Sequence, residues 1–97
     1  MRVRLHPAAR AEIHEAADWY AMRAGQCVAS DFVSAYDEVR SRIVEHPQIG
    51  KPSAEGTRKL PFRGFPYSLV YRLAPDHIVI VAIAHRRRRP GYWGKRR

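Results

Sequence analysis

The sequence has one cysteine, Cys27, no internal repeat and no apolar run long enough to cross a membrane, which takes about 20 residues. A single cysteine excludes an internal disulfide framework and is typical of a reducing compartment. Together with five histidines that show no ligand-like spacing, it also argues against a metal site. Residues 1–7 lack the apolar stretch of a signal peptide. We therefore expect a cytoplasmic protein with no membrane segment, metal or cofactor.

Acidic residues are almost missing from the second half of the chain. Residues 58–97 hold eleven Lys or Arg residues and one acid, Asp76, which gives a net charge of +10. Residues 1–57 have a net charge of −1. A surface that served only solubility would mix the two signs, because charge of one sign repels itself. The asymmetry predicts an anionic partner, which is a nucleic acid, an acidic protein or an anionic membrane surface.

The length of 97 residues predicts a single domain, and its first half is expected to open with a strand and then form a helix. Val3 and Leu5 flank a polar residue, as in a short strand. Apolar residues then recur at helical spacing over residues 8–23, with a proline in the first turn and Gly25 as the stop. These features predict an amphipathic first helix.

A second helix is expected, with an apolar stripe from Val28 to Ile43 and with Ser30 or Asp31 as its cap or in its first turn. It is expected to end at His46-Pro47. The connection between the helices is short and contains a glycine, which favours an antiparallel hairpin.

The remainder of the chain is rich in residues that favour strands. Residues 50–56 are expected to be a loop, and strands are expected from Arg58, over residues 68–73 and over residues 78–84. The last of these is apolar on both alternating faces, which is typical of a central strand. The order β-α-α-β-β-β predicts an α+β fold, in which the helical hairpin packs on one face of a twisted, mainly antiparallel sheet. Basic residues are expected on the other face and its C-terminal edge.

Three segments resemble the RelE/ParE superfamily, the toxins of type II toxin–antitoxin modules. They are His6-Pro7-Ala8-Ala9 leading to Ala16-Ala17-Asp18-Trp19-Tyr20, the string Phe65-Pro66-Tyr67-Ser68-Leu69-Val70-Tyr71-Arg72, and His85-Arg86-Arg87 with Pro90-Gly91-Tyr92-Trp93. The last segment is similar to the ending found in the ParE-like, plasmid stabilisation branch. The resemblance covers nearly the whole chain.

This resemblance implies a toxin with an antitoxin partner. In the superfamily, the C-terminal segment of the antitoxin wraps the toxin and blocks it, and such segments are commonly acidic, which fits the basic half of this chain. ParE-like members act on DNA gyrase, whereas RelE-like members cut messenger RNA in the ribosome. We expect growth inhibition by binding, with gyrase as the target. The alternatives are a ribosome-dependent mRNA endonuclease and a non-toxic basic binding module.

His85 is the candidate catalytic residue if the protein cuts RNA. Metal-free cleavage needs a base, an acid and cations that stabilise the transition state. Histidine suits the acid–base role at neutral pH, and ribonucleolytic relatives have a histidine at the matching place. However, Ser68 stands where those relatives have an arginine, and Arg86 stands where they have a tyrosine. Arg72 lies ~13 Å further along the strand, too far to replace that arginine. The sequence therefore argues against an enzyme. The alternative role for His85 is to cap the end of its strand through a backbone hydrogen bond.

The other candidates form a predicted surface for the target or the antitoxin. It consists of basic and aromatic residues from the second half of the chain: Arg58, Lys59, Arg63, Arg72, His85, Arg86, Arg87, Arg89, Tyr92 and Trp93. The alternative for the two aromatic residues is to pack back onto the sheet, and for the arginine run it is a solvated surface. Trp19 and Tyr20 are expected to pack in the core or against the antitoxin.

Overall fold

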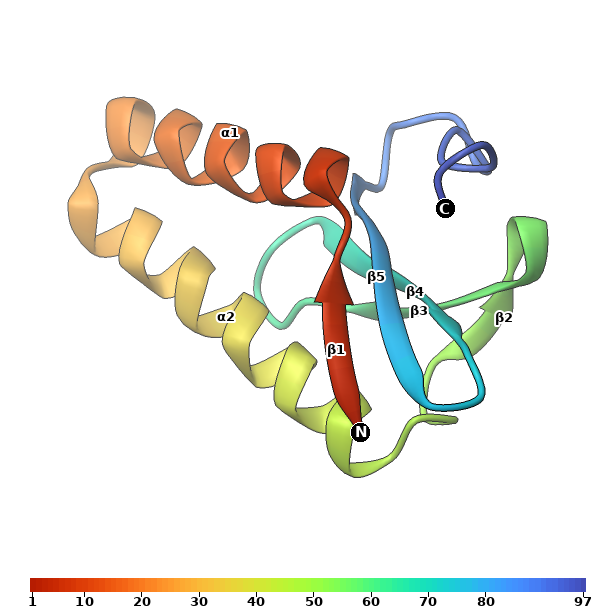
Figure 1. Ribbon diagram of the computed structural model, residues 1–97. Coiled ribbons are helices and arrows are strands. Elements are labelled where there is room, and N and C mark those ends of the chain that lie inside the picture. Colours follow the sequence, from red (N-terminus) through yellow and green to blue (C-terminus); the bar gives the residue numbers. More distant parts are fainter.

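The computed structural model describes all of residues 1–97 and shows two helices packed on one face of a five-stranded sheet (Figure 1). In chain order the elements are β1 (Arg2–Leu5), α1 (Pro7–Ala24), α2 (Gln26–Glu45), β2 (Lys51–Ser53), β3 (Thr57–Pro61), β4 (Tyr67–Leu73) and β5 (His77–His85). The strands lie in the order β1-β5-β4-β3-β2, and only the β1–β5 pair is parallel. The predicted α+β fold, its mainly antiparallel sheet and the central position of the last strand are confirmed.

The helical hairpin turns at a single residue, Gly25, which has a φ of 95° that glycine adopts without steric cost. Its carbonyl oxygen accepts a hydrogen bond from the Ala29 amide, so α2 begins directly after it, at Gln26. The expected role of Ser30 or Asp31 as a cap or first-turn residue was therefore wrong, because α2 begins at Gln26 and both residues lie beyond its first turn. The predicted end of α2 at His46 is confirmed.

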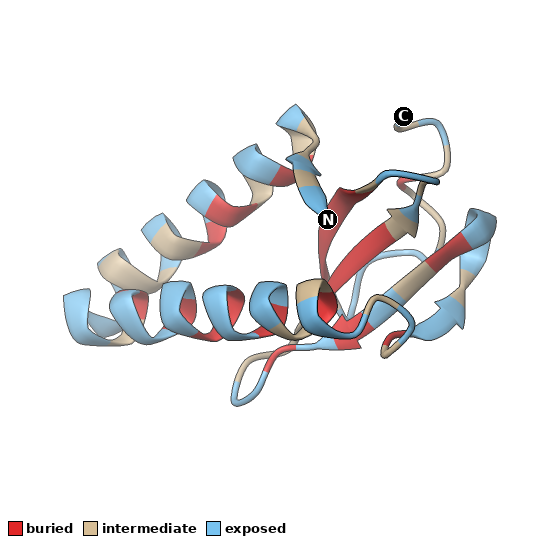
Figure 2. Cartoon of the chain, turned by 60° about the horizontal axis from the view of Figure 1, so that its bottom comes forward, coloured by how far each residue is buried: buried red, intermediate tan, exposed pale blue.

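The main core lies between the helices and the sheet (Figure 2). It is built from one stripe of each helix and the facing sides of the strands: Ala9, Ile13, Ala16, Phe32, Ala35, Tyr36, Val39, Ile43, Leu60, Phe62, Leu69, Tyr71, Ile78, Ile80 and Ile83. The apolar spacing of the sequence thus identified the buried helix faces. Neither helix combines the length and the apolar character needed to cross a membrane.

Residues 50–56 are more ordered than the expected loop. They form the edge strand β2 and a short 3-10 turn, Ala54–Gly56. The prediction was wrong because Lys-Pro-Ser has little preference for a strand, and only pairing with β3 fixes it there; proline is accepted because the strand is at the edge. Gly50 precedes this strand, and a Cβ at Gly50 would lie 2.7 Å from the hydroxyl of Tyr71, so the close approach requires glycine.

On the opposite face of the sheet, a second and smaller apolar cluster forms where the C-terminal segment, residues 86–97, packs on the strands. Its members are Val70, Val79, Val81, Ala82, Ala84 and Trp93. The expectation that basic residues occupy this face was wrong for its centre, which is apolar and covered. The four arginines after β5, residues 86–89, are exposed to solvent.

Candidate functional site

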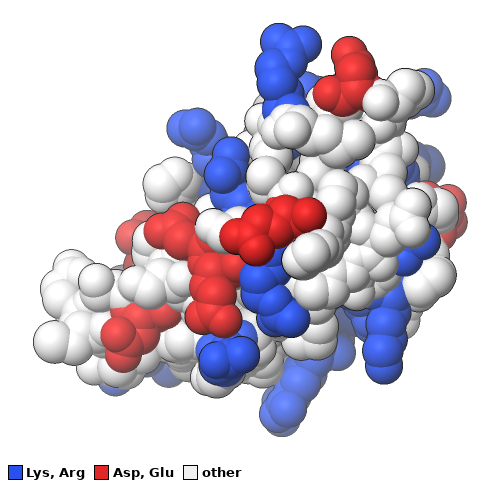
Figure 3. Space-filling model, turned by 90° about the horizontal axis from the view of Figure 1, so that it is seen from below, with Lys and Arg blue, Asp and Glu red and all other residues white.

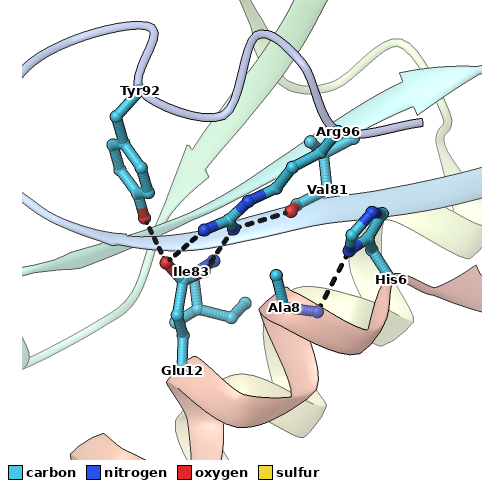
Figure 4. Close-up of polar contacts among 7 residues, drawn as sticks. All are labelled: His6, Ala8, Glu12, Val81, Ile83, Tyr92 and Arg96. Atoms are coloured by element: carbon cyan, nitrogen blue, oxygen red, sulfur yellow. Dashed lines mark hydrogen bonds and ion pairs between the residues drawn. The ribbon is translucent and has the colours of Figure 1, made fainter.

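A hydrogen-bonded network around Glu12 holds the C-terminal segment against the sheet (Figure 4). One carboxylate oxygen of Glu12 accepts from the Ile83 amide at 3.0 Å and from Arg96 at 2.8 Å. The other accepts from the Tyr92 hydroxyl at 2.7 Å and again from Arg96 at 3.1 Å. The side chains of Glu12 and Arg96 are only 12% and 19% exposed, respectively. The network therefore joins α1, β5 and the C-terminal segment.

The network forms because β5 is longer than its neighbour β1. The strand β1 pairs with β5 only as far as Ile80, so the following backbone groups on that edge have no strand partner. Glu12 accepts the Ile83 amide, and Arg96 donates to the carbonyl of Val81 at 3.1 Å. Two side chains thus satisfy backbone groups that would otherwise be buried without a partner.

The same contacts keep the two donors of the network, Arg96 and Tyr92, protonated. The hydrogen bond to Glu12 raises the pKa of Arg96. Burial, followed by the hydrogen bond to Glu12, raises the pKa of Tyr92. Both groups therefore stay protonated donors at physiological pH, and Glu12 receives their hydrogen bonds.

Arg72, one of the predicted binding residues, holds the end of the C-terminal segment. It donates to the main-chain oxygen of Arg96 at 2.6 Å and, more weakly, to that of Glu55 at 3.3 Å and 3.4 Å. On the other side of the segment, Arg4 donates to the main-chain oxygen of Arg97 at 2.6 Å. Main-chain oxygens therefore accept from three of the five N–H groups of Arg72, which ties this side chain to the C-terminal segment.

Tyr92 and Trp93 fold back onto the sheet, which was the alternative considered for them. Trp93 is only 4% exposed and belongs to the second apolar cluster. Tyr92 packs beside it, with the ring centroids 5.2 Å apart, and the guanidinium of Arg88 lies 4.0 Å from the Tyr92 centroid. Trp93 therefore packs in the core between the sheet and the C-terminal segment and is not available for contact with a partner.

His85 ends β5 and shapes the turn that follows. Its Nδ1 accepts a hydrogen bond from the Arg87 amide at 3.1 Å, and its ring meets that of Tyr67 edge-to-face at 5.0 Å. Ser68 lies opposite Ala84 on the neighbouring strand, close to His85. No carboxylate is hydrogen-bonded to His85, so its ring is positioned by the turn and by an aromatic neighbour.

The basic candidates fall into two groups. Arg58 donates to the carbonyls of Gln48 and Gly50, and Arg63 lies 3.7 Å from a carboxylate oxygen of Glu38. The second group is exposed and makes no side-chain hydrogen bond or ion pair within the chain: Lys59, Arg86, Arg87 and Arg89. This second group is the part of the predicted surface that is free to meet a partner.

The acidic residues lie mostly on the helices. Seven of the nine belong to α1 and α2, and Figure 3 shows acidic side chains grouped at the left and centre of one face, with Lys and Arg mostly around its margin. The hairpin also exposes apolar surface: Trp19 is 51% and Met22 is 87% exposed. A groove between the helices is lined by four apolar residues, Ala17, Ala21, Ala29 and Val33, and by three polar ones, Asp18, Gln26 and Ser30. Tyr20, in contrast, packs against Phe32 and Phe65.

Glu12 and Arg96 were not among the residues predicted from the sequence. Glu12 lies three residues after Ala9 and four before Ala16, both buried, so it borders the apolar stripe of α1. That position was the available signal. Arg96 had none, because nothing in a run of basic residues shows which one turns inward.

Comparison with known proteins supports the resemblance. The sequence profile of the ParE toxin of the type II toxin–antitoxin system parDE matches residues 3–90. A solved structure described as the chromosomal ParDE TA system from P. aeruginosa is similar, with 25% identity and a TM-score of 0.78 over 88% of this chain and 95% of that one. No curated protein matches significantly. Since the profile covers nearly the whole chain, the protein belongs to the ParE toxin family of type II toxin–antitoxin systems.

Proposed function

We propose that this toxin inhibits growth by binding DNA gyrase, and that a cognate acidic antitoxin neutralises it in the cytoplasm. Family membership supports the module. The observation that carries the choice of binding over RNA cleavage is the state of His85, whose Nδ1 is committed to the turn amide of Arg87.

Metal-free RNA cleavage needs an acid and a base on either side of the reacting phosphate. Among the side chains that line the cavity beside Ser68, His85 is the only imidazole, and no carboxylate lies beside it. The basic side chains Lys59, Arg86 and Arg88 supply positive charge there, and the cavity has neither a second imidazole nor a carboxylate to pair with His85 in proton transfer. The side chains in this cavity therefore support a toxin that acts by binding its target and not by cleaving RNA.

The structure offers two surfaces for the antitoxin. The free basic side chains around the C-terminal end of β5 suit an acidic segment, and the groove between the helices suits apolar side chains. We propose that the acidic part of the antitoxin contacts the first surface, because electrostatic complementarity supplies both fast association and partner choice.

A gyrase supercoiling assay tests the proposal. The purified toxin is expected to inhibit supercoiling or to trap cleaved DNA, and the antitoxin is expected to reverse the effect. His85→Asn keeps an acceptor for the turn amide but removes acid–base chemistry, so this variant should inhibit gyrase as well as the parent protein does. Normal supercoiling at excess toxin would rule out gyrase.

Growth after induction without antitoxin separates the remaining alternatives. Growth arrest with cut ribosome-bound transcripts, abolished in His85→Asn, would instead identify an mRNA endonuclease. Normal growth would identify a non-toxic binding module. Arrest with intact transcripts is the expected result.

A further inference from the structure

A small cavity of about 140 Å³ lies on the sheet face that carries the C-terminal segment, apart from the Glu12 network. Its floor consists of apolar residues of the second cluster, and its walls are polar: Ser53, Lys59, Ser68, His85, Arg86 and Arg88. No acidic residue lines it. Three of its side chains carry a permanent positive charge, so the cavity attracts anions.

Two residues that line the cavity, Trp93 and His85, carry hydrogen-bond donors without an acceptor in the chain. The indole Nε1 of Trp93 is buried and has no hydrogen-bond partner. Buried donors are nearly always paired in folded proteins, so such a group calls for an explanation. His85 adds a second donor. Its Nδ1 accepts from a backbone amide, so the proton of the neutral ring lies on Nε2.

The neighbouring strands place positive charge beside the cavity at an energetic cost. Lys59 of β3 lies directly opposite Lys51 of β2, and also opposite Val70 of β4 on its other side. Directly opposed side chains share one face of a sheet, so both lysines lie on the face that holds the cavity. Like charges in this position destabilise a sheet. An anion bound in the cavity beside Lys59 would offset part of that repulsion.

We propose that this cavity binds a phosphate group of a nucleic acid strand. The alternative ligand with the same charge is a carboxylate of an acidic peptide. Of the apolar residues that line the cavity only Pro90 is exposed, so a peptide finds little apolar contact inside it. We expect the acidic antitoxin segment at the exposed arginines outside the cavity, Arg87 and Arg89. The polar walls of the cavity, with Lys51 opposite Lys59 on the neighbouring strand, suit the repeating charge of a phosphate backbone. The proposal does not depend on gyrase being the target.

Nuclear magnetic resonance of the two indole N–H groups tests the proposal directly. Trp93 reports on the cavity, and Trp19, on the hairpin, is an internal control. Inorganic phosphate at constant ionic strength is expected to shift the Trp93 signal saturably and to leave the Trp19 signal in place. Acetate should have little effect. No shift with phosphate would overturn the proposal, and an equal or stronger response to acetate would overturn it in favour of a peptide carboxylate.

DNA and RNA oligonucleotides of the same sequence then distinguish the source of the phosphate. A saturable shift of the Trp93 signal with either one supports the proposal and identifies the preferred strand. Absence of binding by both overturns it.

Charge-matched variants separate a built site from general attraction. Lys59→Met removes one cavity cation, whereas Arg10→Met removes one charge from an exposed position on α1, which covers the other sheet face. Lys59→Met is expected to weaken oligonucleotide binding about tenfold and to lower the slope of log K against log salt by about 1. Arg10→Met should change neither quantity appreciably. Equal effects of the two variants would overturn the proposal, and Arg86→Met provides a second cavity variant.

Discussion

At the scale of single residues, Glu12 connects parts of the chain that lie far apart in sequence. Its carboxylate receives hydrogen bonds from Ile83, Tyr92 and Arg96, which lie 71, 80 and 84 positions away. These partners leave no carboxylate oxygen without a donor. The side chain therefore accepts the Ile83 amide, which has no strand partner on that edge of β5, and also holds the C-terminal segment through Tyr92 and Arg96.

Glu12→Ala is expected to lower the free energy of unfolding by about 2–3 kcal/mol, because it leaves Arg96 and the Ile83 amide without their partner in a mostly buried site. Urea unfolding followed by circular dichroism measures the loss. Glu15→Ala is the matched control, since Glu15 lies on the same helix, is exposed and makes no hydrogen bond or ion pair. Equal losses in the two variants would show that the network contributes nothing specific.

Individual roles were predicted from the sequence only where the pattern was local. The terminal position of His85 on its strand followed from the apolar run before it, and the proposed backbone capping corresponds to its observed contact with the Arg87 amide. The roles of Glu12 and Arg72 depend on where the C-terminal segment folds back, which no local pattern contains. The sequence therefore predicted a basic surface but did not show which of its arginines bond to main-chain oxygens within the chain.

At the scale of elements, the start of α1 depends on His6. Its Nδ1 accepts the Ala8 amide at 3.0 Å and so caps the helix. Partial burial, with the nearby charges of Arg96 and Arg4, lowers the pKa of His6 below its ordinary value of 6.5. The folded state therefore binds a proton less readily than the unfolded chain does. The stabilisation is complete above the ordinary pKa and is lost as the pH falls through the lowered one.

His6→Asn is expected to flatten this pH dependence, because asparagine caps a helix without titrating. Urea unfolding of both proteins between about pH 7 and pH 5 provides the comparison. The parent protein should lose more stability than the variant over this range, while carboxylate titration affects both alike. Parallel curves would mean that protonation of His6 does not affect folding.

Tyr71 anchors the turn between α2 and β2 to the sheet. Its buried hydroxyl donates to the carbonyl of Pro47 at 2.7 Å and accepts from the Gly50 amide at 2.9 Å. Tyr71→Phe should therefore cost about 1–3 kcal/mol of unfolding free energy, because it leaves a buried amide unpaired. Tyr67→Phe is the control, since the Tyr67 hydroxyl makes no hydrogen bond, and its cost should stay below about 0.5 kcal/mol. Urea unfolding measures both losses, and a larger loss in Tyr67→Phe than in Tyr71→Phe would contradict the anchoring role of Tyr71.

Helices and strands with a long apolar repeat were predictable from the sequence, whereas an element that forms only by pairing with a neighbouring strand was not. The helices and β5 carry long apolar patterns, so their existence and most of their ends followed from the sequence. β2 has only three residues and a proline, and its pairing with β3 creates it. The start of α2 was missed because a backbone turn at Gly25 replaced the side-chain cap that the sequence suggested.

At the scale of the whole molecule, the two signs of charge are separated. Most acids lie on the helices, whereas the free cations surround the C-terminal end of β5. The groove of the hairpin is lined mostly by apolar residues, with one acid, Asp18, and no cation. An acidic antitoxin therefore meets two chemically different surfaces, and the salt dependence of its binding shows which one dominates.

Binding of the antitoxin is expected to weaken at least about tenfold between about 0.1 M and 0.5 M NaCl, because salt screens exposed charges within a few ångströms of the surface. Replacing Arg86, Arg87 and Arg89 by glutamine should weaken binding and flatten the salt response. The matched control replaces Arg10, Arg23 and Arg40, which are exposed on the helices, and should leave both nearly unchanged. Calorimetric titration at several salt concentrations measures all three proteins. A flat response with full affinity in every protein would place the antitoxin on the apolar groove of the hairpin, since burial of apolar side chains does not depend on screening.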